Sequence, residues 1–450
     1  MSTLAVGSLY GASTLFVMLL GVPVAFALGA VAIAFMMLFM PSSALDTVTQ
    51  NVYEEMGSIT LLSIPLFILK GAAIGKSRAA SDLYAAIHRW LSRVPGGLGI
   101  ANVLACAMFA AMAGSSPATC SAVGSAGIPE MRRRGYSGGF AAGLIAAGGT
   151  LGILLPPSIT MILYAVAAQV SLGRLFLAGI VPGLVLVSLF AGYAALNYRR
   201  EARAARRIFE QGGPRSPYLD DERFDLGDKL RTLPRALPFV VLLIGVMVAL
   251  YGGYATASET AGLGAMLALV LILIVYRMWR PRDLAPVFAS TLKESTMLMF
   301  IIGMSVLYAY VMSYLHISQS AAEWIVALSL PRWALLAATL LLVVALGFFL
   351  PPVSIILMTA PIVLVPLKAA GFDLIWFGVV MTIVMEMGLI HPPVGLNIFV
   401  IRNIAPDIPL SQIIRGVLPL LALMIAAVVL MSVCPRIATV LPDALMGRNG

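Results

Sequence analysis

The chain alternates long apolar runs with short polar loops. Residues 14–40, 236–250 and 334–350 form runs that carry no charged side chain. Each approaches or exceeds the ~20 residues that a helix needs to cross a bilayer core of about 30 Å. The first run is interrupted at Gly21-Val22-Pro23, which predicts two spans joined by a turn. The pattern therefore predicts an all-α polytopic membrane protein.

Composition supports this prediction and excludes other classes of protein. The 450 residues are 60% hydrophobic and only 11% charged, against roughly 25% charged in soluble domains. The net charge of +9 lies in short loops between apolar runs, where membrane proteins carry orientation signals, so we expect no nucleic-acid partner. The three cysteines, Cys106, Cys120 and Cys434, are too far apart for a metal site or a disulfide framework.

The basic residues also predict the topology. The densest charged stretch, residues 198–235, reads as a cytoplasmic linker between two halves. Placing it inside also brings the basic clusters at 131–134 and 277–282 inside, and leaves Arg174 as a single external charge. The N- and C-termini then lie in the periplasm. Residues 76–94 are polar and amphipathic, which favours an interfacial helix on the cytoplasmic face.

An internal repeat relates the two halves. A shift of 236 positions, from Pro156-Pro157 to Pro392-Pro393, aligns them without a gap, and Gly152 then falls on Gly388. With one further residue of slip, Pro182 meets Pro419. The predicted topology places corresponding positions on opposite sides of the membrane. The repeats are therefore inverted, as in many secondary transporters.

Both Pro-Pro pairs predict broken helices. Two prolines remove backbone donors and disfavour helical geometry in the residue before them. In a membrane such a break is tolerated where it is buried in protein or lines a wet cavity, and its free carbonyls can coordinate Na⁺. The purely structural alternative is a proline kink in a packed helix. It explains one such site more easily than two related ones.

A second interruption precedes each break. Residues 114–119 (Gly-Ser-Ser-Pro-Ala-Thr) split an apolar stretch from about 99 to 128 that begins and ends near cytoplasmic charges. This pattern predicts a re-entrant hairpin whose tip hydroxyls bind an ion or a carboxylate, although small residues there also suit close helix packing. The counterpart tip at 349–354 is poorer in hydroxyls, so we expect the two sites to differ chemically.

Few ionisable residues lie within the apolar runs. Glu386 and His391 flank the second break and can bind an ion or substrate, gate, or hydrogen-bond a freed backbone group. We expect His391 to be the ligand-site residue. Glu259 instead completes a capping box with Thr256.

No motif for enzyme chemistry is present. Residues 71–77 resemble a phosphate-binding loop but have one residue too few between the glycines and follow an apolar span. There is no HExxH motif. We therefore expect neither an enzyme nor a nucleotide cofactor.

Several stretches carry a resemblance to a known family: residues 21–29, 63–67, 113–119, 152–157, 255–261 and 385–397. Over essentially its full length the chain resembles the large membrane (permease) subunit of TRAP (tripartite ATP-independent periplasmic) transporters. The resemblance implies an elevator-type fold with two re-entrant hairpins and two broken helices. It also implies coupling to two or more Na⁺ ions and uptake of an organic anion across the bacterial inner membrane. The implied partners are a separate small four-helix membrane subunit and a periplasmic binding protein.

The expected domain plan follows both repeats. Residues 1–94 and 236–330 supply scaffold and arm helices, 95–197 and 331–434 supply the hairpins, broken helices and closing spans, 198–235 form the linker, and 435–450 form a C-terminal tail.

The expected site residues lie at the hairpin tips and breaks. The expected substrate contacts are Ser115, Ser116, Thr119, Pro157, His391 and Asn397. The expected Na⁺ ligands are Ser115, Ser116, Gly149, Thr150, Gly152, Pro156, Pro351, Ser354, Gly388, His391, Pro392 and Gly395.

The sequence departs from the family pattern at two places. It reads Leu350-Pro351-Pro352 where the family often has an acidic residue, and His391 where the family often has Thr. The first departure puts standard ion ligation at the second site in doubt, and the second predicts altered selectivity for the substrate or ion.

The leading prediction for the function is a Na⁺-coupled permease that receives its substrate from a binding protein. The alternatives are a stand-alone ion-coupled anion carrier and, in another class, a membrane enzyme or channel.

Overall fold

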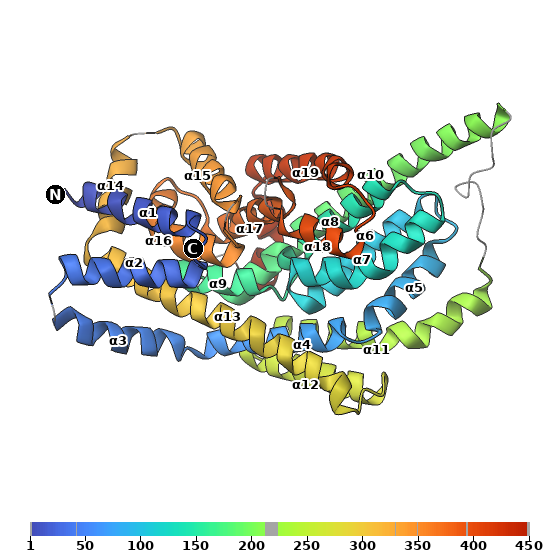
Figure 1. Ribbon diagram of the computed structural model, residues 1–450, viewed down its shortest axis with the longest axis horizontal. Helices are drawn as coiled ribbons and strands as arrows, with labels where there is room; N and C mark the ends of the chain where they lie inside the picture. Colours follow the sequence, from blue (N-terminus) through green and yellow to red (C-terminus); the bar gives the residue numbers. More distant parts are fainter. Residues whose placement is uncertain are drawn as a thin grey trace.

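The structure is a computed structural model that describes residues 2–41, 43–211, 224–328, 330–348, 350–392 and 395–447. Every regular element in these ranges is a helix, which confirms the all-α prediction (Figure 1). The first half contains α1 (Thr3–Leu19), α2 (Val24–Phe39), α3 (Ser43–Met56), α4 (Ile59–Gly75), α5 (Ala79–Leu91), α6 (Gly97–Ala113), α7 (Ser116–Arg133), α8 (Gly138–Leu154), α9 (Ile159–Ala168) and α10 (Leu172–Glu210). The second half contains α11 (Leu226–Tyr251), α12 (Ala257–Ile274), α13 (Pro281–Tyr314), α14 (Ile317–Ala327), α15 (Arg332–Gly347), α16 (Pro352–Ala369), α17 (Leu374–Ile390), α18 (Leu396–Ile404), α19 (Leu410–Val433) and α20 (Arg436–Met446).

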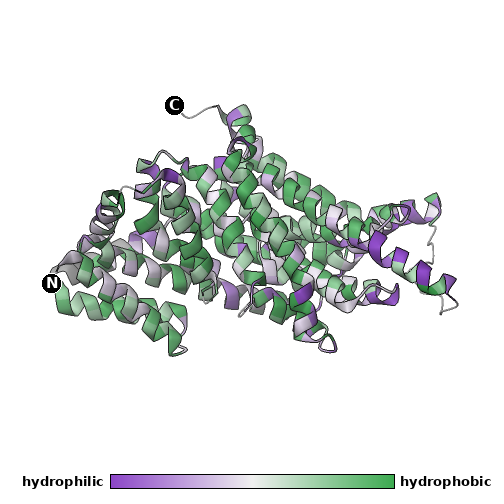
Figure 2. Ribbon diagram, turned by 90° about the horizontal axis from the view of Figure 1, so that it is seen from above, coloured by the Kyte–Doolittle hydropathy of each residue, from purple (hydrophilic) through white to green (hydrophobic). Residues whose placement is uncertain are grey.

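The helices have the length and polarity of membrane spans. Within the described residues, five are long and apolar enough to cross a membrane, and eight spans result if each of three bent pairs counts as one. Most of the ribbon carries the colour of hydrophobic residues, whereas hydrophilic residues are frequent at the end of the molecule where α10 ends (Figure 2). This distribution is that of a multi-pass membrane protein.

The helix boundaries repeat at the offset found in the sequence. The hairpin helix α7 begins at Ser116 and α16 begins at Pro352, and the broken helices α8 and α17 begin at Gly138 and Leu374, each pair 236 residues apart. The packing repeats as well, because α8 lies against α19 and α17 lies against α10, the long helix that closes the other half. The two halves are therefore built alike, and the broken helix of each half packs against the closing helix of the other.

The crossing of α8 and α19 depends on glycine. A Cβ atom at Gly143 would lie 2.8 Å from the Cα atom of Gly416, and one at Gly139 would lie 2.8 Å from the carbonyl oxygen of Gln412. The two backbones are thus in direct contact. Small residues allow such close helix packing in membranes, where no hydrophobic force drives helices together.

The connection between the halves differs from the prediction. The closing helix α10 continues without a break to Glu210, and α11 already begins at Leu226. The basic stretch at 199–207 is thus helical, because its arginines favour helix once a span has nucleated the turns before them. Residues 212–223 of the linker lie outside the described residues.

The C-terminal segment, expected as a tail, forms helix α20. It is held by Arg174 of α10, which donates to Asp443 Oδ1 at 2.8 Å and to the carbonyl oxygen of Gly447 at 2.5 Å. Arg174 is only 8% exposed. Arg174, the single external charge in the predicted topology, is therefore a buried residue that binds the C-terminal segment.

The expected capping box is present. The hydroxyl of Thr256 accepts from the backbone N–H of Glu259 at 3.3 Å, and the carboxylate of Glu259 accepts from the backbone N–H of Thr256 at 2.8 Å. This reciprocal pair satisfies two free donors at the start of α12, so Glu259 has a structural role.

The crossing generates a stability prediction. Replacing Gly143→Val should push α8 and α19 apart and cost about 1–3 kcal/mol, the usual penalty for overpacking. We expect the melting temperature of the purified chain to fall by several degrees. Gly192→Val in α10 is the control, because nothing lies within 4 Å of a Cβ atom there. Equal melting temperatures for the two variants would contradict a glycine-dependent crossing.

Candidate functional site

The tip of the first hairpin is short. Helix α6 ends at Gly114, whose φ of +60° favours glycine, and α7 begins after Ser115. Only Gly114 and Ser115 are non-helical, so the expected interruption at 114–119 is narrower than predicted. Ser116 to Thr119 form the first turn of α7, because Pro117 is well tolerated there.

The first Pro-Pro pair breaks a helix as predicted. Helix α8 ends at Leu154, the Pro156–Pro157 bond is cis, and α9 starts again with a bend of 42°. Ser158 caps α9 by accepting from the backbone N–H of Met161 at 3.2 Å. A Cβ atom at Gly114 would lie 3.0 Å from the carbonyl oxygen of Pro157. The hairpin tip and the break therefore touch.

A buried hydrogen bond joins the two halves at this point. Ser116 Oγ, in the first turn of α7, donates to Glu386 Oε2 of α17 at 2.6 Å. Glu386 is 1% exposed, and its Oε1 has no hydrogen-bond partner among the described residues. Its carboxyl group therefore has a buried acceptor that is not used.

Asn397 brings the second broken segment to the same place. Its amide nitrogen donates to the carbonyl oxygen of Ala146 at 3.1 Å, and within the described ranges its Oδ1 is buried without a partner. A Cβ atom at Gly149 would lie 3.4 Å from that amide nitrogen and 3.0 Å from the carbonyl oxygen of Ser116. Ser116, Gly149 and Asn397 therefore come together, although they belong to three helices.

Of the remaining residues of the first predicted site, some join this cluster and others do not. Gly152 belongs to the cluster, since a Cβ atom there would lie 3.2 Å from Thr119 Oγ1 and 3.3 Å from the carbonyl oxygen of Ser115. The Thr119 hydroxyl donates to the carbonyl oxygen of Ser115 at 2.9 Å. The Thr150 hydroxyl instead donates to Ala147 at 2.6 Å and faces Met424 of α19, so it does not join the group.

The second predicted site lies where α15, α16 and α17 meet. Pro351 caps α16, and a Cβ atom at Gly388 would lie 2.8 Å from the carbonyl oxygen of Gly347. The hydroxyl of Ser354 is fully buried and has no partner in the described part of the chain. This tip thus offers a free oxygen ligand despite its low hydroxyl content.

His391 ends α17 and lies beside an aromatic ring. Its imidazole stacks on Phe348 with ring centroids 4.8 Å apart, and its Nδ1 contacts the carbonyl oxygen of Pro392. Gly395, with φ +48°, precedes α18. Pro393 lies outside the described residues. His391 is half-buried, whereas Glu386, which sequence reasoning ranked lower, is the fully buried group.

A cavity of about 510 Å³ opens beside the first hairpin tip. The tip residues Ser115 and Pro117 form one wall, and Thr160 of α9 and Pro352 of α16 border it. The opposite wall comes from α4 and α13 and includes Lys76, Ser290 and Glu294. Sequence reasoning did not place these last three residues at the site, because only the packing of α4 and α13 brings them to the cavity, while Thr160 was detectable as a hydroxyl just after the break.

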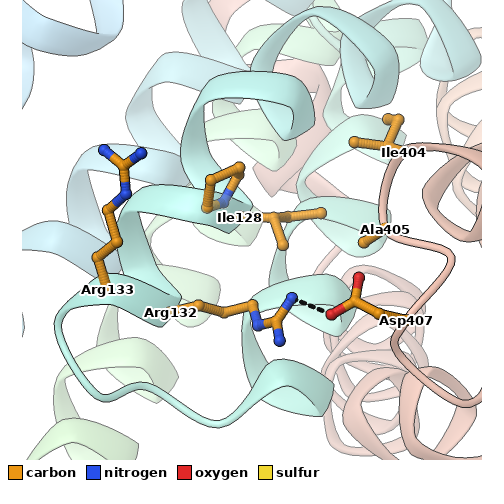
Figure 3. Close-up of a pocket in the computed structure, with 7 residues that line it drawn as sticks. Ile128, Arg132, Arg133, Ile404, Ala405 and Asp407 are labelled. Atoms are coloured by element: carbon orange, nitrogen blue, oxygen red, sulfur yellow. Dashed lines mark hydrogen bonds and ion pairs between the residues drawn. The ribbon is translucent and has the colours of Figure 1, made fainter.

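A separate surface pocket of about 450 Å³ lies at the base of the first hairpin. Arg132 of α7 binds Asp407, which precedes α19, while Arg133 points away from it (Figure 3). The hydrogen bond from Arg132 lowers the pKa of the Asp407 carboxyl below its usual value. Arg132 is about 24 Å from Ser116 along α7, at 1.5 Å per residue. This pocket is therefore distinct from the cavity at the tip.

The chain matches known proteins over nearly its whole length. Residues 12–437 match the family described as "Tripartite ATP-independent periplasmic transporter, DctM component". Two relatives are named C4-dicarboxylate TRAP transporter large permease protein. The one from Pseudomonas aeruginosa is 36% identical over 91% of this chain and 92% of its own length, and the one from Rhodobacter capsulatus is 34% identical over 95% and 97%.

More distant relatives share the same architecture. The sialic acid TRAP transporter large permease protein from Vibrio cholerae is 26% identical over 98% of this chain and 99% of its own. The solved structure of the Alcanivorax borkumensis YdaH transporter is similar in fold, with a TM-score of 0.59 and 14% identity over 95% of this chain and 97% of that one. These matches identify a transporter permease, not an enzyme. The chain belongs to the DctM component family of tripartite ATP-independent periplasmic transporters.

Proposed function

We propose that this chain is the membrane permease of a Na⁺-coupled importer that receives an organic carboxylate from a periplasmic binding protein. The observation that carries the proposal is the cavity of about 510 Å³ between the first hairpin tip and the wall formed by α4 and α13. Its volume lies within the roughly 300–1,000 Å³ of small-molecule sites. It also adjoins both hairpins, where an alternating-access carrier needs its substrate.

The lining of the cavity combines hydroxyls with one cation, Lys76, and one carboxylate, Glu294. Ser115 and Thr160 present hydroxyls, and Lys76 supplies a positive charge at the wall. The relatives with 33–36% identity are named for C4-dicarboxylates, and others for sialic acid or ectoine. A C4-dicarboxylate is therefore the first substrate to test. In this proposal six residues contribute to substrate binding: Ser115, Ser116, Thr119, Pro157, His391 and Asn397.

Buried oxygen atoms near the two hairpins fit Na⁺. A hard cation prefers oxygen ligands, and broken helices supply them as carbonyls. Buried oxygens of Glu386, Asn397 and Ser354 have no partner among the described residues. A carboxylate buried without a cation is costly, so a bound Na⁺ near Ser116 would gain its counter-charge from Glu386.

The proposed ion sites follow the two hairpins. The first uses Ser115, Ser116, Gly149, Gly152 and the carbonyl of Pro156. The second uses Pro351, Ser354, Gly388, His391, Pro392 and Gly395. Thr150 is the weakest of the predicted ligands, because its hydroxyl is already bonded within α8.

The transport cycle and partners complete the proposal. Residues 95–197 and 331–434, which hold the hairpins and broken helices, would move as an elevator against the helices that include α4 and α13. The family description is tripartite, which supports a small membrane subunit and a periplasmic binding protein as the other two components. The inner membrane, with both termini in the periplasm, is the proposed location.

Reconstitution tests the function directly. In proteoliposomes that contain this chain, its small membrane subunit and the external binding protein, an inward Na⁺ gradient should drive uptake of labelled succinate. Removing the gradient or the binding protein should lower the initial rate at least tenfold. Equal uptake by this chain alone would instead favour a stand-alone carrier, and an uncoupled conductance would refute both.

The bond between the halves gives a second prediction. Ser116→Ala leaves Glu386 without its donor, and an unsatisfied buried group costs about 1–3 kcal/mol. We expect the Na⁺ concentration for half-maximal uptake to rise about tenfold. Ser125→Ala on the same helix is the control, because that hydroxyl is exposed and bonds only to Ala122. If both variants match the parent protein, the proposed first ion site is wrong.

His391 gives a third prediction. Its ring stacks on Phe348 at the second hairpin. We therefore expect a substitution of His391 to alter substrate binding. His391→Thr should change the relative uptake rates of dicarboxylates and monocarboxylates, because it removes the ring that stacks on Phe348. An uptake profile that matches the parent protein would remove His391 from the site.

A further inference from the structure

A third and larger pocket lies beside the connection from α12 to α13, which Figure 1 shows at the lower edge of the molecule. It has a volume of about 870 Å³ and lies between the end of α4, the start of α5 and the turn from α12 to α13. Its charged lining consists of four basic and two acidic residues: Lys76, Arg78, Arg277, Arg282, Asp82 and Asp283. We propose that this pocket binds the phosphate headgroup of an anionic phospholipid.

The charge of the pocket favours an anion. Four cations against two carboxylates leave a formal excess of two positive charges. Within the described part of the chain, no ion pair or hydrogen bond engages the side chains of Arg78, Arg277 or Arg282, whereas Lys76 interacts electrostatically with Glu294 of α13. The three guanidinium groups that line the pocket repel one another, and a phosphate between them relieves this repulsion.

Apolar side chains continue from the pocket along the neighbouring helix. Met266, Val270 and Ile274 are exposed at four-residue spacing on α12, so they form one stripe that ends beside Val275 at the pocket. Trp279, which is 66% exposed, lies in the turn from α12 to α13. Indole rings favour the membrane interface. A free phosphate would use the charges alone, whereas a lipid uses the charges and the stripe together.

The position relative to the bilayer agrees with this occupant. The basic turn at 277–282 lies on the expected cytoplasmic side, where basic pockets between helices receive lipid headgroups and each cation contributes about 1 kcal/mol. Lys76 also lines the cavity at the hairpin tip. A bound headgroup would therefore partly neutralise a charge that faces the transport cavity. The lipid site itself does not depend on the proposed Na⁺ coupling or substrate.

Trp279 provides the reporter for a test. The full chain is reconstituted in phosphatidylcholine vesicles that contain brominated phosphatidylglycerol or, separately, brominated phosphatidylcholine. The quenching of Trp279 is the difference in fluorescence loss between the parent chain and Trp279→Phe. We expect phosphatidylglycerol to quench Trp279 at a several-fold lower mole fraction than phosphatidylcholine.

Charge variants identify the pocket. The double variant Arg277→Gln, Arg282→Gln should abolish this several-fold preference, because both cations contribute to headgroup binding. The double variant Arg203→Gln, Arg206→Gln is the matched control, because these cations lie at the far end of α10 outside the pocket. Equal quenching by the two lipids, or a loss of preference in both double variants, would overturn the proposal.

Soluble competitors separate the possible anions. Millimolar inorganic phosphate or succinate, at constant ionic strength, should leave the quenching by phosphatidylglycerol unchanged, since neither has an acyl chain. Displacement by phosphate would mean a site for the free ion, and displacement by succinate would mean a vestibule for the transported anion. Either result would overturn a lipid site.

Discussion

The close packing of the first hairpin on the broken helix α8 positions the rest of the site. Glycines at 148, 149 and 152 let α8 approach the hairpin so closely that a Cβ atom would meet Cys106 Sγ at 2.8 Å, the Ser116 carbonyl at 3.0 Å and Thr119 Oγ1 at 3.2 Å. In a membrane, non-helical backbone is tolerated only where protein or a wet cavity surrounds it. This contact surrounds the Pro156-Pro157 break and fixes one wall of the cavity.

Polar groups collect where this packing is tightest. Leaving a buried donor or acceptor without a partner costs about 1–3 kcal/mol. Oxygens of Glu386, Asn397 and Ser354 nevertheless remain unpartnered in the described chain, and all three are almost fully buried. In the proposed function, a bound Na⁺ would satisfy these oxygens.

The two repeats share a backbone but not a chemistry. Helices α7 and α16 start at equivalent positions, and so do α8 and α17. The first hairpin presents Ser115, Ser116 and Thr119, whereas the second presents proline residues and Ser354. Only the second break carries an imidazole. The repeat therefore supplies two related backbone frameworks that carry different side chains.

The sequence by itself determined the elements that depend on local chemistry. Apolar length predicted the spans, the Pro-Pro pair at 156–157 predicted a broken helix, Thr256 and Glu259 predicted a cap, and the offset of 236 residues predicted the repeat. Each rests on backbone donors, turn preferences or span length, which neighbouring residues set. Only the tertiary structure joined Ser116 to Glu386, brought Asn397 to Gly149, turned Thr150 toward α19 and placed Lys76 beside the cavity. Those contacts link residues up to 274 positions apart, and helix packing rather than local sequence decides which of their faces meet.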